Sequence, residues 1–440
     1  METVALTRNP METKVRNIAL SIYLMGIFMG ALDHGIVGPA LTSIVSTFNI
    51  STSWGVWSFT IYTLLFAVSI PLMGKFSDRF GRKQIFMLGI ALFGIGSLLA
   101  AFAPNYLMFL VGRSVQAIGT GGIFPITAAF IAVSYPQEAR AKVMGLIGVI
   151  FSLGSILGPI IGGYIIQNLD WTWIFLINIP ISILVLVSMS ALKLPQVVMK
   201  KPVDFAGIVL LTTVIFLIML GITMKNIILL VIGLVVIPML VVIERRAKDP
   251  VIKLNYFNSK ITLLILFFSL MSGFIMASTI NLLPLFIETT FEVNKSTAAL
   301  GVTPLAITSM IASLIGGNMV TKHGAKKVLF IGFVITALGT LSLTVPTTYN
   351  TFLMVAGIIG FGIGIIIGAP LNILIIQATS MAEAGASVGL LSLFRSLGST
   401  IGPTIAGIIL ATVTDGFFYL SILLGGLSII SLGLFTLLKK

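Results

Sequence analysis

Long apolar runs separated by short polar segments make up almost the whole of this chain. The runs lack the alternation of apolar and polar side chains that membrane barrel strands show. They extend over about 20 residues or more, which is enough for a helix to cross a bilayer. Because helices satisfy their own backbone hydrogen bonds within lipid, the pattern predicts an all-α polytopic membrane protein.

The apolar runs form two sets of six around a central segment. The first set lies at residues 17–48, 53–73, 84–103, 106–134, 141–166 and 172–195. The second set lies at residues 260–288, 296–320, 328–345, 350–378, 385–410 and 416–438. The predicted domains are an N-terminal cytoplasmic tail (1–16), a first six-helix bundle (17–195), a central segment (196–259) and a second six-helix bundle (260–440).

The central segment decides between twelve and fourteen spans. Lys200-Lys201 precede residues 205–243 and Glu244-Arg245-Arg246 follow them, so both ends should lie on the same side of the membrane. The apolar stretch is long enough for two short helices at about 1.5 Å per residue, with a turn at Lys225-Asn226. A surface pair of amphipathic helices is the alternative, but the polar face that it needs is absent. We therefore predict two extra central helices and fourteen spans.

Composition supports a membrane protein and excludes several other classes. The chain has 440 residues, of which 57% are hydrophobic and 9% charged, and its mean hydropathy is +1.14, which leaves no room for a sizeable soluble domain. It has no cysteine, which excludes disulfides and thiolate metal sites. Since there is no phosphate-binding P-loop and no soluble Ser/His/Asp cluster, we predict that it is not an enzyme and has no cofactor. With only two histidines, His34 and His323, we also predict no metal site.

The net charge of +13 would suit nucleic acid, but its placement argues against such a partner. Only Lys225 and Lys295 fall in loops on the side opposite the other basic loops, and Arg113 and Arg395 lie inside apolar runs. This is the positive-inside pattern. It predicts a cell-membrane protein with both termini in the cytoplasm, and the excess charge suits anionic lipid rather than nucleic acid.

A short basic loop occurs twice. The first copy runs from Gly74 to Lys83, and it contains Asp78, Arg79, Gly81 and Arg82. In the second copy, Gly317, Lys322, Gly324 and Lys326 stand where Gly74, Arg79, Gly81 and Lys83 stood, 243 residues later. A membrane protein whose second half repeats its first is most simply a transporter of two related bundles.

Asp33 is the leading candidate for a functional residue, because a carboxylate near the middle of a span is costly and can lower that cost by taking a proton. A structural ion pair that never titrates is the alternative. His34 is adjacent, but neighbours i and i+1 on a helix do not face each other. We expect His34 to be a second titrating group or a hydrogen-bonding group in a cavity.

Arg113 needs a buried partner, because arginine cannot lose its charge, and Asp33 is the only acid inside the first bundle. Their pairing either changes as Asp33 titrates or is a permanent architectural contact. Glu288, at the end of a span, is a further titrating candidate or a solvated loop acid. Arg395 lies deep in the second bundle, and the sequence names no partner for it.

Two further features suggest moving contacts. Gly154, Gly158 and Gly162 share one helix face beside Pro159 and Gly163, and Gly398, Gly402, Pro403 and Gly407 repeat the element. We interpret it as a hinge or seam between the bundles, with ordinary helix packing as the alternative. Asp78 is expected near the start of another helix, where a carboxylate is favoured and would latch the bundles on the cytoplasmic side.

Together these elements resemble the drug:proton antiporters of the major facilitator superfamily, in the branch with fourteen spans. The resemblance covers nearly the whole chain. Its motifs are the loop at 74–83, Leu32-Asp33, Arg113 with Gln116, the element around Pro159, Trp171–Pro180 and Asp204–Gly207. His34, Ala117 and Glu288 depart from the usual pattern of that branch. His34 and Glu288 would add titratable groups, which puts a coupling scheme with a single site in doubt.

The resemblance implies two bundles rocking about a central cavity, in a bacterial cell membrane and as a monomer. We expect efflux of amphipathic, cationic compounds in exchange for protons, with Asp33 competing between proton and substrate. A narrow exporter of one metabolite, lipid or antibiotic is the alternative within transport. A sensor or scaffold that uses the same fold without transport is the alternative from another class.

Overall fold

The computed structural model describes residues 12–50, 52–55, 57–195, 204–224, 226–247, 250–293, 301–344, 348–379, 384–435 and 437. Among these residues the regular structure consists of α-helices and two short 3-10 helices, with no strand. Most of the predicted tail, residues 196–203 and Lys225 lie outside the described residues, and so do the side chains of Pro159 and Glu288.

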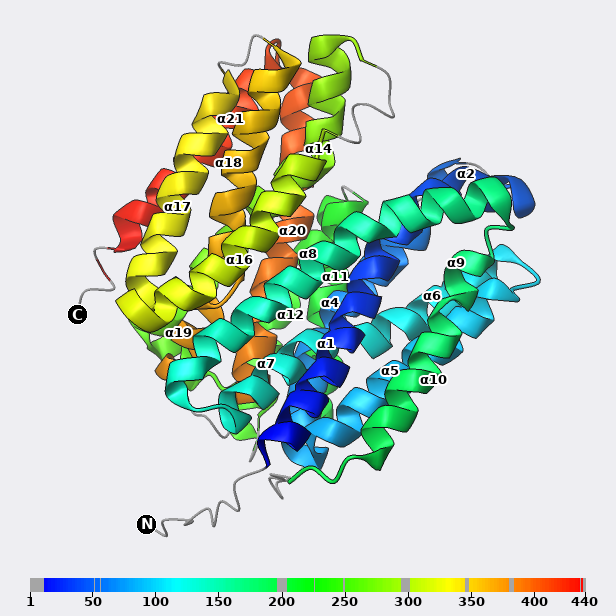
Figure 1. Cartoon of the computed structure of the whole chain (residues 1–440), viewed down its shortest axis with the longest axis vertical. Coiled ribbons are helices and arrows are strands. Elements are labelled where there is room, and N and C mark those ends of the chain that lie inside the picture. Colours follow the sequence, from blue (N-terminus) through cyan, green and yellow to red (C-terminus); the bar gives the residue numbers. More distant parts are fainter. Residues whose placement is uncertain are drawn as a thin grey trace.

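The first group of helices lies at the lower right of Figure 1. Its helices are α1 (Thr13–Ile36), η1 (Gly38–Ala40), α2 (Leu41–Thr47), α3 (Thr52–Gly55), α4 (Trp57–Phe80), α5 (Arg82–Ala101), α6 (Tyr106–Gly121), α7 (Ile123–Ser134), α8 (Gln137–Asn168), α9 (Trp173–Leu176) and α10 (Asn178–Ala191).

The second group lies at the upper left of Figure 1, and the C-terminus is part of it. Its helices are α13 (Asn255–Asn258), α14 (Lys260–Phe291), α16 (Thr303–His323), α17 (Ala325–Leu341), η2 (Ser342–Thr344), α18 (Tyr349–Ile367), α19 (Pro370–Ala378), α20 (Ala384–Thr412) and α21 (Gly416–Leu434).

The two groups repeat the same packing. In the first group α1 packs on α8, and α5 packs on α6; in the second α14 packs on α20, and α17 packs on α18. The contacts between the groups repeat as well, since α4 packs on α20 and α16 packs on α8. The repeat predicted from the basic loops is therefore present throughout the fold.

The first predicted span, residues 17–48, is wrong as a single helix. Its helix α1 ends at Ile36, and a short 3-10 turn over Gly38–Ala40 separates it from α2. Pro39 lacks a backbone N–H and cannot continue the helical hydrogen-bond ladder. The apolar run therefore continues through a break that hydrophobicity alone does not reveal.

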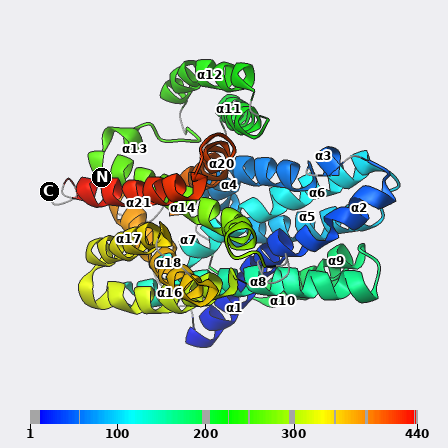
Figure 2. The same cartoon turned by 90° about the horizontal axis from the view of Figure 1, so that it is seen from above.

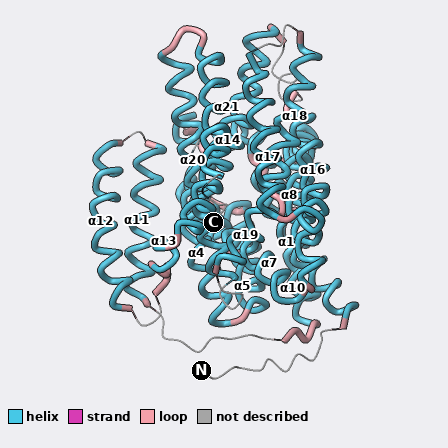
Figure 3. The backbone as a smooth tube through the Cα atoms, turned by 90° about the vertical axis from the view of Figure 1, so that its left-hand side faces the viewer, coloured by secondary structure: helices cyan, strands magenta, loops and turns pink. Residues whose placement is uncertain are grey.

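The two central helices form an antiparallel pair, α11 (Phe205–Thr223) and α12 (Ile227–Arg246). Asn226 begins α12, where its Oδ1 accepts a hydrogen bond from the backbone N of Ile228 at 3.0 Å. These helix ends lie on either side of the predicted turn, of which Lys225 lies outside the described residues. Helix α11 packs beside α4 and α20, and the pair lies outside both groups as Figures 2 and 3 show.

Twelve helices, or pairs of consecutive helices, are long and apolar enough to cross a membrane among the described residues. The set includes α12 but neither α11 nor α20. The apolar part of α11, Ala206–Ile222, is shorter than the other candidates, and α20 contains Arg395 among serines and glycines. The predicted count of fourteen spans is therefore not confirmed.

Candidate functional site

A buried ion pair joins α1 to α6 inside the first group. Arg113 Nη1 donates to Asp33 Oδ2 at 2.8 Å, and the same nitrogen donates to Gln116 Oε1 at 2.8 Å. The exposed fractions of Asp33 and Arg113 are 0% and 2%. The predicted partnership of Asp33 with Arg113 is therefore present, and it is shielded from solvent.

Neutral polar groups from three other helices complete this network. Gln116 Nε2 donates to Ser97 Oγ of α5 at 2.6 Å, and Asn178 Nδ2 of α10 donates to the same oxygen at 3.3 Å. Arg113 Nε donates to the carbonyl oxygen of Ser58 in α4 at 3.3 Å. The network therefore ties together five helices of one bundle.

Tyr62 joins this network to His34. Its ring lies 4.3 Å from the Arg113 guanidinium carbon, and its hydroxyl is 2.9 Å from Thr120 Oγ1. The ring of His34 packs against the same tyrosine at 5.5 Å. A guanidinium over an aromatic face is stabilised by the ring's quadrupole, so Tyr62 contributes to holding Arg113 in place.

A cavity of about 190 Å³ lies between the two groups of helices. Its wall includes His34 of α1, Phe66 of α4, Phe124 of α7 and Arg395 of α20. His34 is exposed to this space, whereas Asp33 is not part of the wall. The structure thus separates the two neighbouring candidates, and it does not support direct competition between proton and substrate at Asp33.

The charge of the wall is positive. Arg395 supplies this charge, and no carboxylate lines the cavity among the described residues. An arginine in a cavity favours an anionic partner. The cationic substrate expected from the sequence therefore finds no counter-charge at this wall.

The two groups also meet at the end of the molecule where α4 ends and α5 begins, which we call the basic end. There the backbone N of Ala386 donates to Asp78 Oδ2 at 2.9 Å, in the first turn of α20. Asp78 thus lies at the start of another helix, as predicted. Its other oxygen is 3.5 Å from Arg82 Nη2.

Glycines allow the helices to approach at this end. A Cβ built on Gly74 would lie 2.7 Å from the carbonyl oxygen of Gly385, and one on Gly317 would lie 2.7 Å from that of Ala141. Gly81 and Gly324 take positive φ angles of 99° and 83°, which other residues rarely adopt. Both copies of the basic loop therefore use their glycines in the same way.

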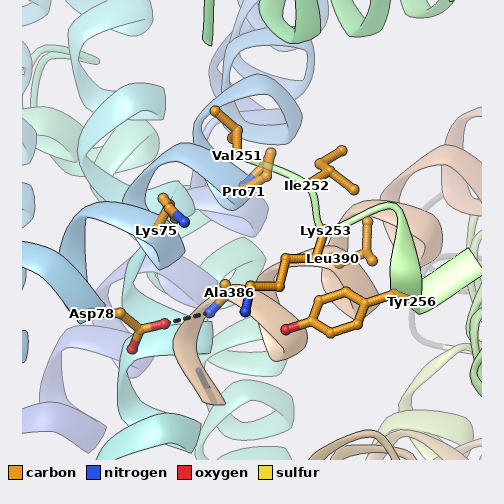
Figure 4. A pocket seen from close by; sticks show the side chains of 9 residues that line it. All are labelled: Pro71, Lys75, Asp78, Val251, Ile252, Lys253, Tyr256, Ala386 and Leu390. Carbon is orange, nitrogen blue, oxygen red and sulfur yellow. Dashed lines mark hydrogen bonds between the residues drawn. The ribbon is translucent and has the colours of Figure 1, made fainter. Parts of the chain in front are cut away.

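The segment after α12 lies against this contact, which the sequence did not predict. Figure 4 shows that Val251, Ile252 and Lys253 line a small pocket together with Asp78. Lys75 Nζ donates to the carbonyl oxygen of Pro250 at 2.9 Å. Arg79, in contrast, lies with its guanidinium carbon 5.2 Å from the Phe80 ring.

The glycines of α8 pack within the first group rather than between the groups. A Cβ on Gly154, Gly158 or Gly162 would lie within 2.8 Å of a backbone carbonyl oxygen of α1, whereas one on Gly163 would meet nothing within 4 Å. The interpretation as a seam between bundles is therefore corrected. The same helix does reach the second group, but through Gly145, whose carbonyl accepts from Ser313 Oγ at 2.9 Å.

Sequence reasoning did not identify the neutral members of the site. Ser58, Tyr62, Ser97 and Asn178 are polar or aromatic residues inside apolar runs, and such residues are common in membrane helices. Asn178 lay inside the Trp171–Pro180 motif, which was the one available signal.

Comparison with known proteins matches residues 23–246 and 262–440 to the Major Facilitator Superfamily. The chain is 35% identical over 427 residues to YfiU, an MFS-type transporter of Bacillus subtilis (strain 168), which covers 91% of this chain and 81% of that protein. It is 30% identical over 411 residues to multidrug resistance protein 3 of the same organism, and this alignment covers 89% of this chain and 78% of that protein.

Solved structures share the fold. The human organic anion transporter MFSD10 superposes with a TM-score of 0.75 at 16% identity, covering 96% of this chain and 99% of that chain. The proton:xylose symporter XylE superposes with a TM-score of 0.71 at 16% identity, covering 98% of this chain and 97% of that chain. At this identity the likeness concerns the fold alone.

Proposed function

Since the chain belongs to the major facilitator superfamily, we propose that it exports amphipathic compounds in exchange for protons by alternating access. Membership makes it a multi-pass membrane transporter. The names of relatives such as multidrug resistance protein 3 and the multidrug transporter protein MdtP support a drug-like range of substrates. A narrow exporter of one compound is the second candidate, favoured by the modest size of the cavity.

The observation that carries the proposal is the buried pair of Asp33 and Arg113 beside a central cavity. A charge pair inside a membrane helix bundle is costly and usually marks an ion or substrate pathway. Asp33 can become neutral by taking a proton, whereas Arg113 cannot lose its charge. A proton on Asp33 would therefore remove the attraction between charges across the 2.8 Å contact and leave Arg113 with neutral partners only.

Protonation of Asp33 is coupled to movement of the bundles through contacts between helices, rather than through a group that binds both proton and substrate. The backbone of α1 from Phe28 to Ile36 packs on the glycine face of α8. The same α8 contacts α16 of the other bundle at Gly145 and Ser313. Release of Arg113 from Asp33 would shift α1, and α8 would carry that shift to the contact between the bundles.

The basic end is cytoplasmic in this proposal, which places both termini inside a bacterial cell membrane. The contacts of Gly74 with Gly385 and of Asp78 with Ala386 would then close the cytoplasmic side, and the described conformation faces outward. Asp78 and its neighbours Arg79, Gly81 and Arg82 act as the cytoplasmic gate. Because the two bundles enclose the cavity within one chain, a monomer suffices for transport.

Fourteen spans remain our proposal for the topology. The helix α12 is apolar enough to cross the membrane, and residues such as Ile228, Val231 and Val235 are exposed on it, as lipid contact requires. Both ends of the α11–α12 pair lie beside basic segments, so α11 must cross with α12. The central position of α20 between α4 and α14 supports its crossing as well.

Acid-loaded proteoliposomes test the transport proposal. A proton gradient should drive accumulation of an amphipathic dye by the wild type, an uncoupler should abolish it, and Asp33→Asn should lose the dependence on the gradient. Asp170→Asn, which changes an exposed loop acid, is the matched control. Accumulation by Asp33→Asn at the wild-type rate would refute coupling through Asp33. Absence of counterflow with any dye would favour a sensor.

A further inference from the structure

One face of α20 presents a polar stripe to the central cavity. Ser392, Arg395, Ser396 and Ser399 all line the cavity, and their spacing of three, four and seven residues places them on the same side of a helix. This stripe belongs to the second bundle, whereas the network of Asp33 lies in the first. It is therefore a separate polar feature that the coupling scheme does not use.

Arg395 differs from the other arginine of the membrane interior. Arg113 donates to a carboxylate, an amide oxygen and a backbone carbonyl. Arg395 has buried Nε and Nη2 atoms without a hydrogen-bond partner among the described residues. Its nearest described aromatic contact is the ring of Phe124, 5.5 Å from the guanidinium carbon.

A guanidinium with two buried, unpaired nitrogens on a cavity wall favours an anionic partner. Arginine keeps its charge, and a buried charge without a partner is strongly unfavourable. The described wall supplies no carboxylate. Ser392, three residues before Arg395, also has a buried hydroxyl without a partner. Two unsatisfied polar groups on one helix face thus point to the polar part of a ligand.

We propose that this stripe binds the head group of an anionic amphiphile, such as a carboxylate or a sulfonate, while the body of the molecule lies among Phe66, Phe124 and Phe151. The guanidinium fork matches the two oxygens of such a head group. The inference rests on the proposed function and names its class of substrate. It replaces a cationic substrate with an anionic one.

The dimensions of the cavity set a limit on the ligand. Its volume is about 190 Å³, somewhat more than the roughly 150 Å³ of an apolar cavity that holds one benzene ring. A larger substrate would need a wider opening between the bundles than the described conformation has. Small aromatic acids and medium-chain fatty acids are therefore the best matched members of the class.

Binding to the full-length purified protein in an uncharged detergent tests the proposal without requiring transport. The probes are 1-naphthoate, as a soluble aromatic acid, and dodecanoate, as a single-chain lipid acid. Naphthyltrimethylammonium, a cation with the same rings, is the control ligand. Quenching of tryptophan fluorescence and calorimetry report the dissociation constants.

Three variants separate charge from shape. Arg395→Lys keeps the charge but loses the fork, so it should weaken acid binding by about threefold, whereas Arg395→Gln should weaken it by at least about tenfold, which corresponds to about 1.4 kcal/mol. Ser392→Asp places a carboxylate three residues from Arg395, where it can pair with the guanidinium, so acid binding should fall by a similar factor. Ser342→Asp, at a half-exposed position outside the cavity wall, should bind like the wild type.

The outcomes distinguish this inference from the transport proposal. Acid binding that depends on Arg395 supports the inference even if no proton-driven transport is found. Preference for the naphthoate indicates soluble acids, and preference for dodecanoate indicates lipid acids; both support the shared chemistry. The inference is overturned if the cation binds more tightly than the acids. Wild-type acid affinity in both Arg395→Gln and Ser392→Asp would overturn it as well.

Discussion

The ion pair of Asp33 and Arg113 predicts an unequal response to neutralisation of its two members. Asp33→Asn leaves a guanidinium that is only 2% exposed and cannot become neutral. Arg113→Gln leaves a carboxyl group that can become neutral by taking a proton. The aspartate variant should therefore lose more stability, although it makes the smaller change in side-chain shape.

The contacts around Arg113 set the size of the effect. Loss of one partner from a buried ion pair typically costs about 3–5 kcal/mol. In Asp33→Asn, Arg113 keeps Gln116 Oε1 at 2.8 Å, the Ser58 carbonyl at 3.3 Å and the Tyr62 ring at 4.3 Å. We therefore expect the lower end of this range, about 3 kcal/mol. Arg113→Gln should cost about 1–2 kcal/mol, as lost hydrogen bonds do.

The double variant Asp33→Asn/Arg113→Gln removes both charges and should recover at least about 1 kcal/mol relative to Asp33→Asn. Unfolding by SDS in mixed micelles, followed through the fluorescence of the four tryptophans, measures these free energies. Asp170→Asn, at an exposed loop position, should stay within about 0.5 kcal/mol of the wild type. Equal losses in the two single variants, or a double variant as unstable as Asp33→Asn, would refute the reasoning.

Three further predictions concern contacts beside the site. Asp78→Asn should weaken the contact with α20 and speed labelling of a single cysteine placed at the basic end, in a chain without native cysteines; unchanged labelling would contradict a latch. Tyr62→Leu should lower the SDS unfolding free energy by about 2 kcal/mol, because Arg113 loses an aromatic face. Tyr62→Phe should lower it by about 1 kcal/mol through its lost hydrogen bond. Equal losses in the two variants would show that the aromatic ring does not stabilise Arg113. Gly158→Ala, whose Cβ would meet a backbone oxygen at 2.8 Å, should lower the unfolding free energy by about 1–3 kcal/mol in the same assay. Gly163→Ala should not lower it. Similar values for the two variants would exclude close packing of α1 on α8.

The sequence was sufficient to predict the ion pair but not its position relative to the cavity. Asp33 and Arg113 are ionisable residues inside apolar runs, and each needs a partner that few residues can supply. The rule that adjacent residues diverge on a helix separates Asp33 from His34. It does not say which of the two faces the cavity, because that depends on the rotation of α1 against its neighbours.

The glycine motifs show the same limit. The spacing of Gly154, Gly158 and Gly162 predicts that they share one face, and the structure places that face against α1. Spacing along one helix carries no information on which helix will be its partner. In the same way, the repeated basic loop predicted two related bundles, but not that Gly385 and Ala141 would lie opposite its glycines Gly74 and Gly317.

The position of α1 offers a reason why proton and substrate need not share a binding group. One face of α1 holds Asp33 against Arg113, the neighbouring residue His34 lines the cavity, and the backbone from Phe28 to Ile36 rests on α8. A small rotation of this helix would change all three contacts together. Proton binding and ligand binding are then coupled, because a ligand that favours one rotation of α1 changes the proton affinity of Asp33. By thermodynamic reciprocity, the proton changes the affinity for the ligand by the same factor. An anionic substrate held at Arg395 is compatible with this scheme, whereas a scheme of direct competition at a carboxylate would exclude it.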